Sequence, residues 1–325
     1  MIKVGIAGGA GYTGGELIRI LLNHPSVEIV FVHSNSNAGN HLYHVHHDLL
    51  GETDLKFSAE ISHSIDVLFL CVGHGDGKKF MEKNKLPSSI KIIDLSQDFR
   101  LNAHATLEDR TFIYGLPELN KTRIQHAQNI ANPGCFATCI QLALLPLAQA
   151  KLLQHPIQVA ATTGSTGAGQ SPSATSHFSW RQNNLSSYKE FEHQHLKEIR
   201  QSLQQAYPTF SQELNFIPYR GNFTRGILAS VYTHCALPES DVRELYENYY
   251  QEHPFTHICK QSVDLKPIVN TNKCFIHLEK HDHKLLITAA IDNLLKGASG
   301  QAVQNMNLLF GLEETVGLKL KSIAF

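Results

Sequence analysis

Short apolar runs alternate with amphipathic segments through the first part of the chain. The runs at residues 2–7, 27–33, 66–72 and 90–95 are apolar enough for strands that are buried on both faces of a sheet. Segments with the spacing of helices separate these runs. This alternation predicts an α/β domain with a Rossmann-type doubly wound parallel sheet, and its last strand is expected at 129–131.

Beyond the middle of the chain the pattern changes to mostly strand-like runs. Strands are expected at residues 159–163, 214–218, 226–236, 273–280 and 284–292, with helices after 135, near 192–199 and near 239–251. Such a pattern predicts an α+β domain with a mostly antiparallel or mixed sheet. Because an amphipathic segment from residue 298 closes the chain, we expect one domain from residues 1–133 plus 298–325 and a second from residues 134–297.

A glycine-rich turn joins the first strand to the first helical segment. Gly8, Gly11 and Gly14 allow a tight turn in which the backbone approaches a pyrophosphate at a helix N-terminus. Tyr12 and Thr13 lie in the same turn and are further candidates for cofactor contact. The strand, turn and helix around these glycines strengthen a motif that is weak by itself.

The end of the second strand indicates which dinucleotide binds. An NAD site usually has Asp or Glu here to bind the ribose hydroxyls, but residues 33–37 contain no carboxylate. Ser34 and Ser36 instead offer hydroxyl groups that can donate to a 2′-phosphate. The sequence therefore favours NADP over NAD, although this stretch lacks the basic residue that NADP sites usually have.

Cys135 follows a Pro-Gly corner and begins an Ala/Leu-rich segment with helical character. A thiol in the first turn of a helix lies near unpaired backbone N–H groups and the positive end of the helix dipole, which favours the thiolate. The alternative is a small buried residue at a tight turn. The rest of the chain has to decide between a nucleophile and a packing residue.

Composition excludes several other classes of protein. With 28 basic and 29 acidic residues among 325, the net charge of −1 gives no sign of nucleic-acid or membrane binding. The apolar runs are short and a strand is expected from residue 2, so we expect no transmembrane helix, no signal peptide and a cytoplasmic location. Histidines at 41–47 lie in a polar loop with no convergent Cys or Glu, and those at 281–283 are expected at a hairpin tip, so no metal site is predicted.

Several longer motifs, in order along the chain, carry a resemblance to a known family. They are Gly8-Gly-Ala-Gly-Tyr-Thr-Gly14, Asp94-Leu-Ser-Gln-Asp-Phe-Arg-Leu101, Tyr114-Gly-Leu-Pro-Glu118, Asn132-Pro-Gly-Cys135, Gly164-Ser-Thr-Gly-Ala-Gly169, His193-Gln-His195 with Glu198-Ile199, Arg225-Gly-Ile227 and Ile291 to Asn305. In these motifs the chain resembles the N-acetyl-gamma-glutamyl-phosphate reductase family, which is related to aspartate-semialdehyde dehydrogenase. It departs from the family's usual residues at Gly73, Phe136, Thr166, Gln170, Gln194 and Lys197.

The resemblance implies a two-step reduction in arginine biosynthesis. Cys135 would attack the acyl phosphate and release phosphate, and the thioester would accept hydride from NADPH to give the semialdehyde. His193 and His195 are the candidates for acid/base work. If the segment is helical, Glu198 lies three residues beyond His195 on the same face, so His195 is favoured and His193 stays open.

Other residues of the motifs are expected to bind ligands. Arg100, Ser165 and Arg225 are candidate substrate contacts, because guanidinium groups match phosphate oxygens and a glycine-rich turn can offer backbone N–H groups. The resemblance implies that Asn293 and Lys296 contact the nicotinamide end of the cofactor, and Gly167 is a further candidate for cofactor contact. The implied partners are an N-acyl-glutamyl phosphate, phosphate and further copies of this chain, as a dimer or tetramer formed by the catalytic domain.

Three alternatives remain at this stage. The same chemistry can act on an aspartyl or aminoadipyl phosphate, and the acyl group of a glutamyl substrate can be acetyl or a larger acid such as succinyl. A protein of this fold can also bind NADP without catalysis. The third, more remote, alternative is a zinc hydrolase that uses the histidine clusters.

Overall fold

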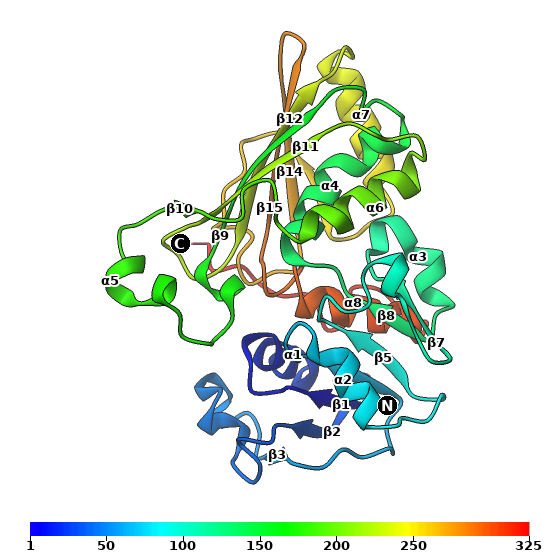
Figure 1. Cartoon of the computed structure of the whole chain (residues 1–325), viewed down its shortest axis with the longest axis vertical. Helices are drawn as coiled ribbons and strands as arrows, with labels where there is room; N and C mark the ends of the chain where they lie inside the picture. The colour runs from blue at the N-terminus through cyan, green and yellow to red at the C-terminus, as the bar shows by residue number, and fades with distance from the viewer. Residues whose placement is uncertain (325) are drawn as a thin grey trace. The chain divides into compact units, whose positions relative to one another are not determined.

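The computed structural model describes residues 1–324 and divides the chain into two compact units (Figure 1). The first unit consists of Met1–Pro133 with Ala298–Lys319, and the second of Gly134–Gly297 with the residues from Leu320 onward. The segment from Leu320 was expected with the first domain. It belongs to the second unit because the Asn270 side chain donates to the Lys321 carbonyl and the Ala324 N–H donates to the Lys266 carbonyl.

An eight-stranded sheet forms the centre of the first unit, in the order β3-β2-β1-β4-β5-β8-β7-β6. Its strands are β1 (Ile2–Ala7), β2 (Val27–His33), β3 (Phe57–Ser58), β4 (Val67–Leu70), β5 (Lys91–Asp94), β6 (Thr106–Leu107), β7 (Arg110–Tyr114) and β8 (Asn129–Ala131). All neighbouring strands are parallel except the hairpin of β6 and β7. Strand order therefore runs outward in both directions from β1 and β4, which is the doubly wound arrangement that the alternating pattern predicts.

The helices of the first unit come from both ends of the chain. They are α1 (Tyr12–Leu22), α2 (Asp76–Lys83), α3 (Pro117–Gln125) and α8 (Ser299–Leu309), with single 3₁₀ turns η1 (Leu42–His44), η2 (His47–Leu49) and η3 (Asn102–His104). Helix α8 packs against α1 and α3, and all its residues are buried. The C-terminal segment thus completes a core that the first 133 residues begin.

A seven-stranded mixed sheet forms the second unit, in the order β10-β11-β9-β12-β15-β14-β13. Its strands are β9 (Ile157–Thr163), β10 (Ser186–Ser187), β11 (Leu214–Arg220), β12 (Ile227–His234), β13 (Thr256–Cys259), β14 (Cys274–His281) and β15 (Lys284–Ile291). The pairs β9–β11 and β13–β14 are parallel and the other pairs are antiparallel. This sheet confirms the expected mixed second domain.

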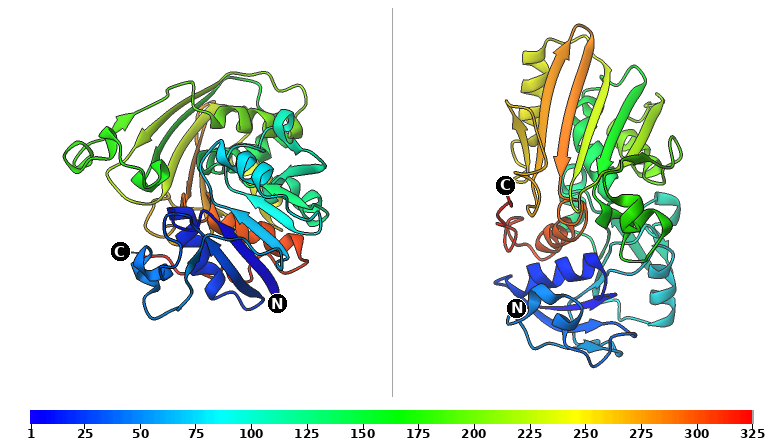
Figure 2. Two further views of the ribbon diagram at one scale, coloured as in Figure 1. Left: turned by 60° about the horizontal axis from the view of Figure 1, so that its bottom comes forward. Right: turned by 90° about the vertical axis from the view of Figure 1, so that its left-hand side faces the viewer.

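Three helices pack against this sheet, namely α4 (Cys135–Gln149), α6 (His195–Ala206) and α7 (Glu239–Tyr250) (Figures 1 and 2). The loops of the unit contain the short helix α5 (Phe178–Arg181) and the 3₁₀ turns η4 (Ser165–Ala168) and η5 (Ala174–Ser176). Helix α4 is almost wholly buried although it contains Pro146. A proline cannot donate to the carbonyl four residues earlier, here that of Leu142. The Tyr250 hydroxyl donates to that carbonyl instead, so the buried acceptor is satisfied. No helix among residues 1–324 is long and apolar enough to span a membrane.

Candidate active site

The glycine turn of the first unit has the geometry that its sequence predicts. Gly8 has a φ of +78°, and a Cβ atom there would lie 2.6 Å from the Cys71 carbonyl oxygen. A Cβ on Gly14 would lie 2.6 Å from the Gly9 carbonyl oxygen. The N–H groups of Gly8 and Gly9 both donate to the His33 carbonyl at 3.1 Å, which fixes the turn to the end of β2. Only residues without side chains permit this close approach of backbone to backbone.

A cleft of about 800 Å³ opens beside the turn within the first unit. Gly8, Gly11 and Ser34 line it, together with His33 and Asn35. These residues lie at the carboxyl ends of β1 and β2, where parallel sheets bind their ligands. The cleft therefore lies where a dinucleotide binds in sheets of this kind.

The other predicted cofactor residues of this unit lie close to the turn but outside the lining of the cleft. Tyr12 begins α1 and is 40% exposed, while the Thr13 hydroxyl is hydrogen-bonded to the Cys71 thiol. Ser36 is exposed and accepts a hydrogen bond from the Asn37 side chain. Since Asn37 also donates to Ser34, the two serines and the amide form one polar group at the end of β2.

Two lysines that the sequence analysis did not select also line this cleft. Lys79 and Lys83 lie on α2, more than 40 residues beyond β2 in the sequence. Burial lowers the pKa of His33, and the positive charge of Lys83 lowers it further against the opposing effect of Asn35. The ammonium group of Lys83 is therefore within electrostatic range of the end of β2. The basic charge that is absent from residues 33–37 comes from the neighbouring helix.

One of the clustered histidines supports the glycine turn. The Nε2 atom of His46 lies 2.7 Å from the Gly9 carbonyl oxygen, and a Cβ on Gly15 would lie 2.6 Å from its Nδ1 atom. His46 thus packs against the turn as a structural residue. Across residues 1–324, no group of three or more His, Cys, Asp or Glu residues is arranged to hold a metal ion.

Cys135 is the first residue of α4, and Gly134 is its N-cap in an extended conformation. Cys135 carries a thiol that is not part of a disulfide, and it is partly exposed. A Cβ on Gly297 would lie 2.8 Å from the Cys135 Cβ, so Gly297 leaves room for the cysteine. Cys139, one turn further, is fully buried, and burial raises the pKa of its thiol. Of these two cysteines, only Cys135 has the exposure and the helix-terminal position of a nucleophile.

The predicted acid/base residues lie next to this cysteine helix. His195 is the first residue of α6, and His193, His195 and Glu198 are all buried. Glu198 Oε2 accepts a hydrogen bond from the Gly134 N–H at 3.0 Å, and Glu198 Oε1 lies 3.9 Å from His195 Nε2. One carboxylate therefore contacts both the N-cap of the cysteine helix and a histidine.

His193 occupies a different environment from His195. Its Nδ1 atom accepts a hydrogen bond from the His195 N–H at 3.2 Å, and its ring packs against Phe136, Tyr188 and Phe216. Burial lowers the pKa of His193 to about 4, and the charges of Lys189 and Arg220 add to this effect. His193 is consequently neutral at pH 7.

Tyr188 is a residue of this site that the sequence analysis missed. Burial raises the pKa of Tyr188 to about 12, and negative charge on Cys135 raises it as well. The phenol hydroxyl is therefore within electrostatic range of the sulfur and stays protonated at neutral pH. No sequence signal distinguished it from the other tyrosines of the chain.

Two arginines predicted to bind substrate already have partners within their units. Arg100 is buried, and it donates from Nε to the Asn132 carbonyl at 2.8 Å and from Nη2 to the Leu95 carbonyl at 2.9 Å. Arg225 forms an ion pair with the buried Asp292, whose Oδ2 lies 3.1 Å from Nε. The predicted substrate role of both arginines stays a prediction.

The second glycine-rich turn is bound to neighbouring backbone of the same unit. The N–H groups of Gly164, Ser165 and Thr166 donate to the carbonyls of Gly226, Phe223 and Thr224. These three backbone groups are therefore used within the fold, and the predicted role of this turn and of Ser165 toward substrate or cofactor stays a prediction. The loop that carries Phe223 and Thr224 pairs with the turn, a contact that local sequence cannot reveal.

Gly167 and Asn293, which were both predicted to contact the cofactor, lie together. A Cβ on Gly167 would lie 4.0 Å from Asn293 Nδ2. The Asn293 amide donates from Nδ2 to Thr166 Oγ1 at 3.0 Å, and its Oδ1 accepts from the Gly226 N–H at 2.7 Å. The amide is thus fixed in orientation beside the glycine.

Comparison with known proteins gives the class that this fold and site define. Residues 3–127 match the family model described as semialdehyde dehydrogenase, NAD binding domain, and residues 135–293 match semialdehyde dehydrogenase, dimerisation domain. Aspartate semialdehyde dehydrogenase II from Vibrio cholerae has the same fold, with a TM-score of 0.74 at 16% identity over 96% of this chain and 99% of that one. The enzyme from Candida albicans, in a structure with NADP, gives a TM-score of 0.69 at 15% identity over 95% and 99%. The chain is a protein of the semialdehyde dehydrogenase class.

Closer relatives narrow the class to one family. The chain is 60% identical over 326 aligned residues to N-acetyl-gamma-glutamyl-phosphate reductases of Phocaeicola vulgatus and Parabacteroides distasonis, which it matches over 100% of both chains. The corresponding protein of Christiangramia forsetii is 55% identical over 99% of both chains. The chain belongs to the N-acetyl-gamma-glutamyl-phosphate reductase family, which confirms the resemblance carried by the motifs.

Proposed function

We propose that this protein reduces N-acetyl-gamma-glutamyl phosphate to N-acetyl-glutamate 5-semialdehyde with NADPH and releases phosphate, as a step of arginine biosynthesis in the cytoplasm. The observation that carries the proposal is a partly exposed cysteine at the first position of α4, next to a buried carboxylate and two buried histidines. Full-length identity of 60% to named reductases supports the choice of substrate.

Cys135 begins the reaction as a thiolate. The sulfur forms a bond to the acyl carbon, and the bond from that carbon to the phosphate oxygen breaks, so phosphate leaves with the electron pair. The position of Cys135 at the start of a 15-residue helix stabilises the thiolate that attacks. NADPH, when bound, supplies the hydride that reduces the resulting thioester.

His195 is the residue we assign to proton transfer. It has Glu198 Oε1 at 3.9 Å, which stabilises a positive imidazolium, whereas His193 is held neutral by burial and uses Nδ1 to accept the His195 N–H. His195 would take the thiol proton of Cys135 before attack. It would then donate that proton to the thioester oxygen as the hydride adds, and accept it again from the same oxygen as the carbon–sulfur bond breaks, the thiolate leaves and the aldehyde forms.

The first unit suits the cofactor because it offers both a backbone cradle and positive charge. The close packing at Gly8 and Gly14 leaves no room for Cβ atoms, as a pyrophosphate site at a helix N-terminus requires. We place the adenosine 2′-phosphate near Ser34, Lys79 and Lys83 in the cleft. Gly167 and Asn293 of the second unit would contact the nicotinamide end.

Two cysteine variants test the proposal. In the reverse direction, the purified enzyme should reduce NADP only when phosphate and N-acetyl-glutamate semialdehyde are both present. Cys135→Ser should lose about 10³-fold or more of this activity, because an alcohol is a weak nucleophile at neutral pH, while its affinity for NADPH stays within about twofold. Cys139→Ser is the matched control, and the buried Cys139 thiol is not expected to matter for the rate. A rate confined to aspartate semialdehyde would overturn the substrate assignment.

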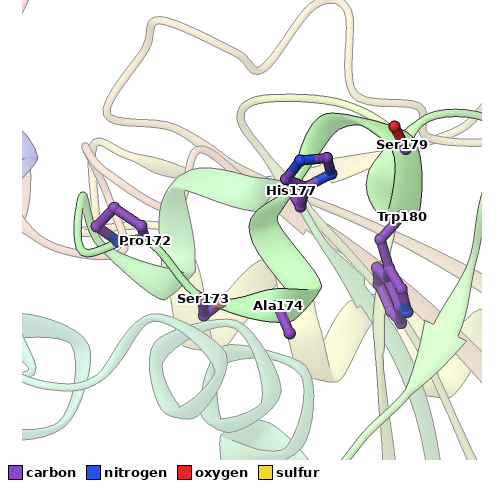
Figure 3. A pocket seen from close by; sticks show the side chains of 6 residues that line it. All are labelled: Pro172, Ser173, Ala174, His177, Ser179 and Trp180. Carbon is purple, nitrogen blue, oxygen red and sulfur yellow. The ribbon is translucent and has the colours of Figure 1, made fainter.

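We also propose that the protein forms a homo-oligomer through its second unit, since that unit matches a dimerisation-domain model. The segment around α5 exposes Phe178, Trp180, Leu185 and Phe191. Beside them lies a pocket of about 770 Å³ lined by Pro172, Ser173, Ala174, His177, Ser179 and Trp180 (Figure 3). Apolar side chains gathered on one loop are typical of an association surface. Phe178→Ser should reduce the molar mass measured by light scattering, and an unchanged mass would exclude this loop from the interface.

A further inference from the structure

Two arginines of the second unit are held at neighbouring points beside the reaction site. Arg181 ends α5 and donates from Nη2 to the Gly221 carbonyl at 2.5 Å. Arg220 ends β11 and donates from Nη1 to Thr175 Oγ1 at 2.7 Å. Because Gly221 directly follows Arg220, the Arg181 guanidinium is bound to the backbone next to Arg220. Burial lowers the pKa of Arg181, and the charge of Arg220 lowers it further.

Neither arginine has an acidic partner. Within residues 1–324, no ion pair joins Arg181 or Arg220 to an aspartate or glutamate. The Nη1 atom of Arg181 is buried and finds no hydrogen-bond partner among these residues. Two partly buried positive charges without a counter-ion, and a buried donor without an acceptor, cost free energy that a bound anion would offset.

Arg220 contacts the ring of Tyr188, and that ring neighbours His193. Arg220 Cζ lies 4.3 Å from the centre of the Tyr188 ring, which is also 5.8 Å from the ring of His193. Tyr188 in turn is within electrostatic range of Cys135. Lys189 adds a further positive charge near His193. An anion at the two arginines would therefore lie beside Tyr188, whose ring also neighbours His193.

We propose that Arg181 and Arg220 form a carboxylate-binding subsite for the substrate, an inference that rests on the proposed function. The phosphoryl group is bonded to the reacting carbonyl and must lie at the sulfur, whereas a carboxylate further along the substrate can reach beyond Tyr188. Two guanidinium groups match the planar geometry of a carboxylate. The carboxylate is either the α-carboxylate of the glutamyl unit or one carried by the N-acyl group.

Steady-state kinetics of Arg181→Gln and Arg220→Gln test the subsite in the phosphate-dependent direction. If the subsite binds the α-carboxylate, the KM for N-acetyl-glutamate semialdehyde should rise about 10- to 100-fold, equivalent to about 1.4–2.8 kcal/mol, with the KM for phosphate within about twofold of the parent. An equal rise with N-succinyl-glutamate semialdehyde identifies the α-carboxylate. A rise confined to the N-succinyl compound identifies a carboxylate of the acyl group. Arg243→Gln, which removes a surface ion pair with Glu239 on α7, is the matched control.

A second measurement keeps this test independent of turnover. N-succinylglutamate, which has no acyl phosphate but carries both candidate carboxylates, should protect Cys135 of the parent from iodoacetamide, and both arginine variants should need at least about 10-fold more of it. A parent enzyme without turnover refutes the proposed function but leaves this binding assay valid. Parent-like KM values and protection in both variants would overturn the subsite, as would a rise confined to the KM for phosphate. Thermal unfolding of each variant checks that the fold is retained.

Discussion

Glu198→Gln is the substitution that most directly tests how the site works. Glu198 Oε2 accepts the Gly134 N–H at 3.0 Å, and Oε1 lies 3.9 Å from His195 Nε2. A glutamine keeps an oxygen that can accept from Gly134, so the start of the cysteine helix is retained. It removes the negative charge that stabilises a protonated His195. The substitution therefore separates the structural contact of this carboxylate from its electrostatic effect.

The expected fall in kcat follows from the distance between Glu198 Oε1 and His195 Nε2. Two unit charges 3.9 Å apart interact by about 4 kcal/mol at an effective dielectric constant of about 20, which is an upper limit for the pair. Hydrogen bonds to charged groups contribute about 1.5–3 kcal/mol after desolvation is included. We therefore expect kcat of Glu198→Gln to fall about 10- to 150-fold with little change in thermal stability. Glu198→Ala should be less active still and less stable, because the buried Gly134 N–H then loses its acceptor.

Phosphate-dependent NADP reduction and the rate of Cys135 alkylation by iodoacetamide are the two assays. Both rates should fall in Glu198→Gln, since the carboxylate supports the histidine that we assign as the base for the thiol. Glu244→Gln, at an exposed position of α7, is the matched control and should leave both rates unchanged. Parent-like kcat and alkylation in Glu198→Gln would refute an electrostatic role for this carboxylate. Parent-like stability in Glu198→Ala would refute its role at the helix start.

Three further predictions concern other parts of the chain. Lys83→Gln should raise the dissociation constant for NADPH about 10-fold in a fluorescence titration and leave the dissociation constant for NADH unchanged, and Lys79→Gln should act in the same direction. Equal effects on both nucleotides would exclude a 2′-phosphate site at these lysines. Burial raises the pKa of Asp94 to about 7, so its contribution to stability is present below about pH 4 and is lost as the pH rises through 7. The unfolding free energy of Asp94→Asn, measured in urea, should therefore rise by roughly 1–4 kcal/mol relative to that of the parent between these two pH values. A difference that stays constant with pH would refute this prediction. Cys139→Ser should lose about 1–2 kcal/mol of unfolding free energy, because its buried thiol packs in the core and donates to the Ala289 carbonyl, whereas a parent-like stability would show that this packing contributes little.

Local patterns predicted the parts of the site that depend on consecutive residues. The strand, glycine turn and helix at Gly8–Gly14 need only a short stretch of chain, and so does the Pro-Gly corner before Cys135. The spacing of His195 and Glu198 on α6 likewise follows from helical periodicity. In each case the residues that act together are close in the sequence, so their geometry is set by backbone rules.

Local patterns could not predict which residues far apart in the sequence are brought together by tertiary structure. Lys79 and Lys83 reach the cofactor cleft because β4 lies beside β1, which places α2 near the end of β2. Arg225 pairs with Asp292, 67 residues away, as β12 and β15 align. The sequence alone does not show whether a charged residue forms an ion pair within the fold or contacts a ligand.

The choice of proton partner for Cys135 also depends on tertiary structure that the sequence does not show. The sequence offers His193 and His195 with almost equal merit, and helical spacing alone favours the second. Burial among three aromatic rings makes His193 neutral, and this burial depends on Phe136 and Phe216 from other elements. Side-chain environment, and not residue type, distinguishes the two histidines.

The split first unit has a consequence for how the protein is made. Helix α8 packs against α1 and α3, and its Asn305 donates to the Gly115 carbonyl and the Asn132 side chain. Ser299 donates to the Thr13 carbonyl next to the glycine turn. During synthesis all strands of the second unit's sheet have been made before α8 emerges from the ribosome. The nucleotide-binding half therefore lacks α8 until late in synthesis, and a chain that stops short of residue 298 would leave the ribosome with that half unfinished.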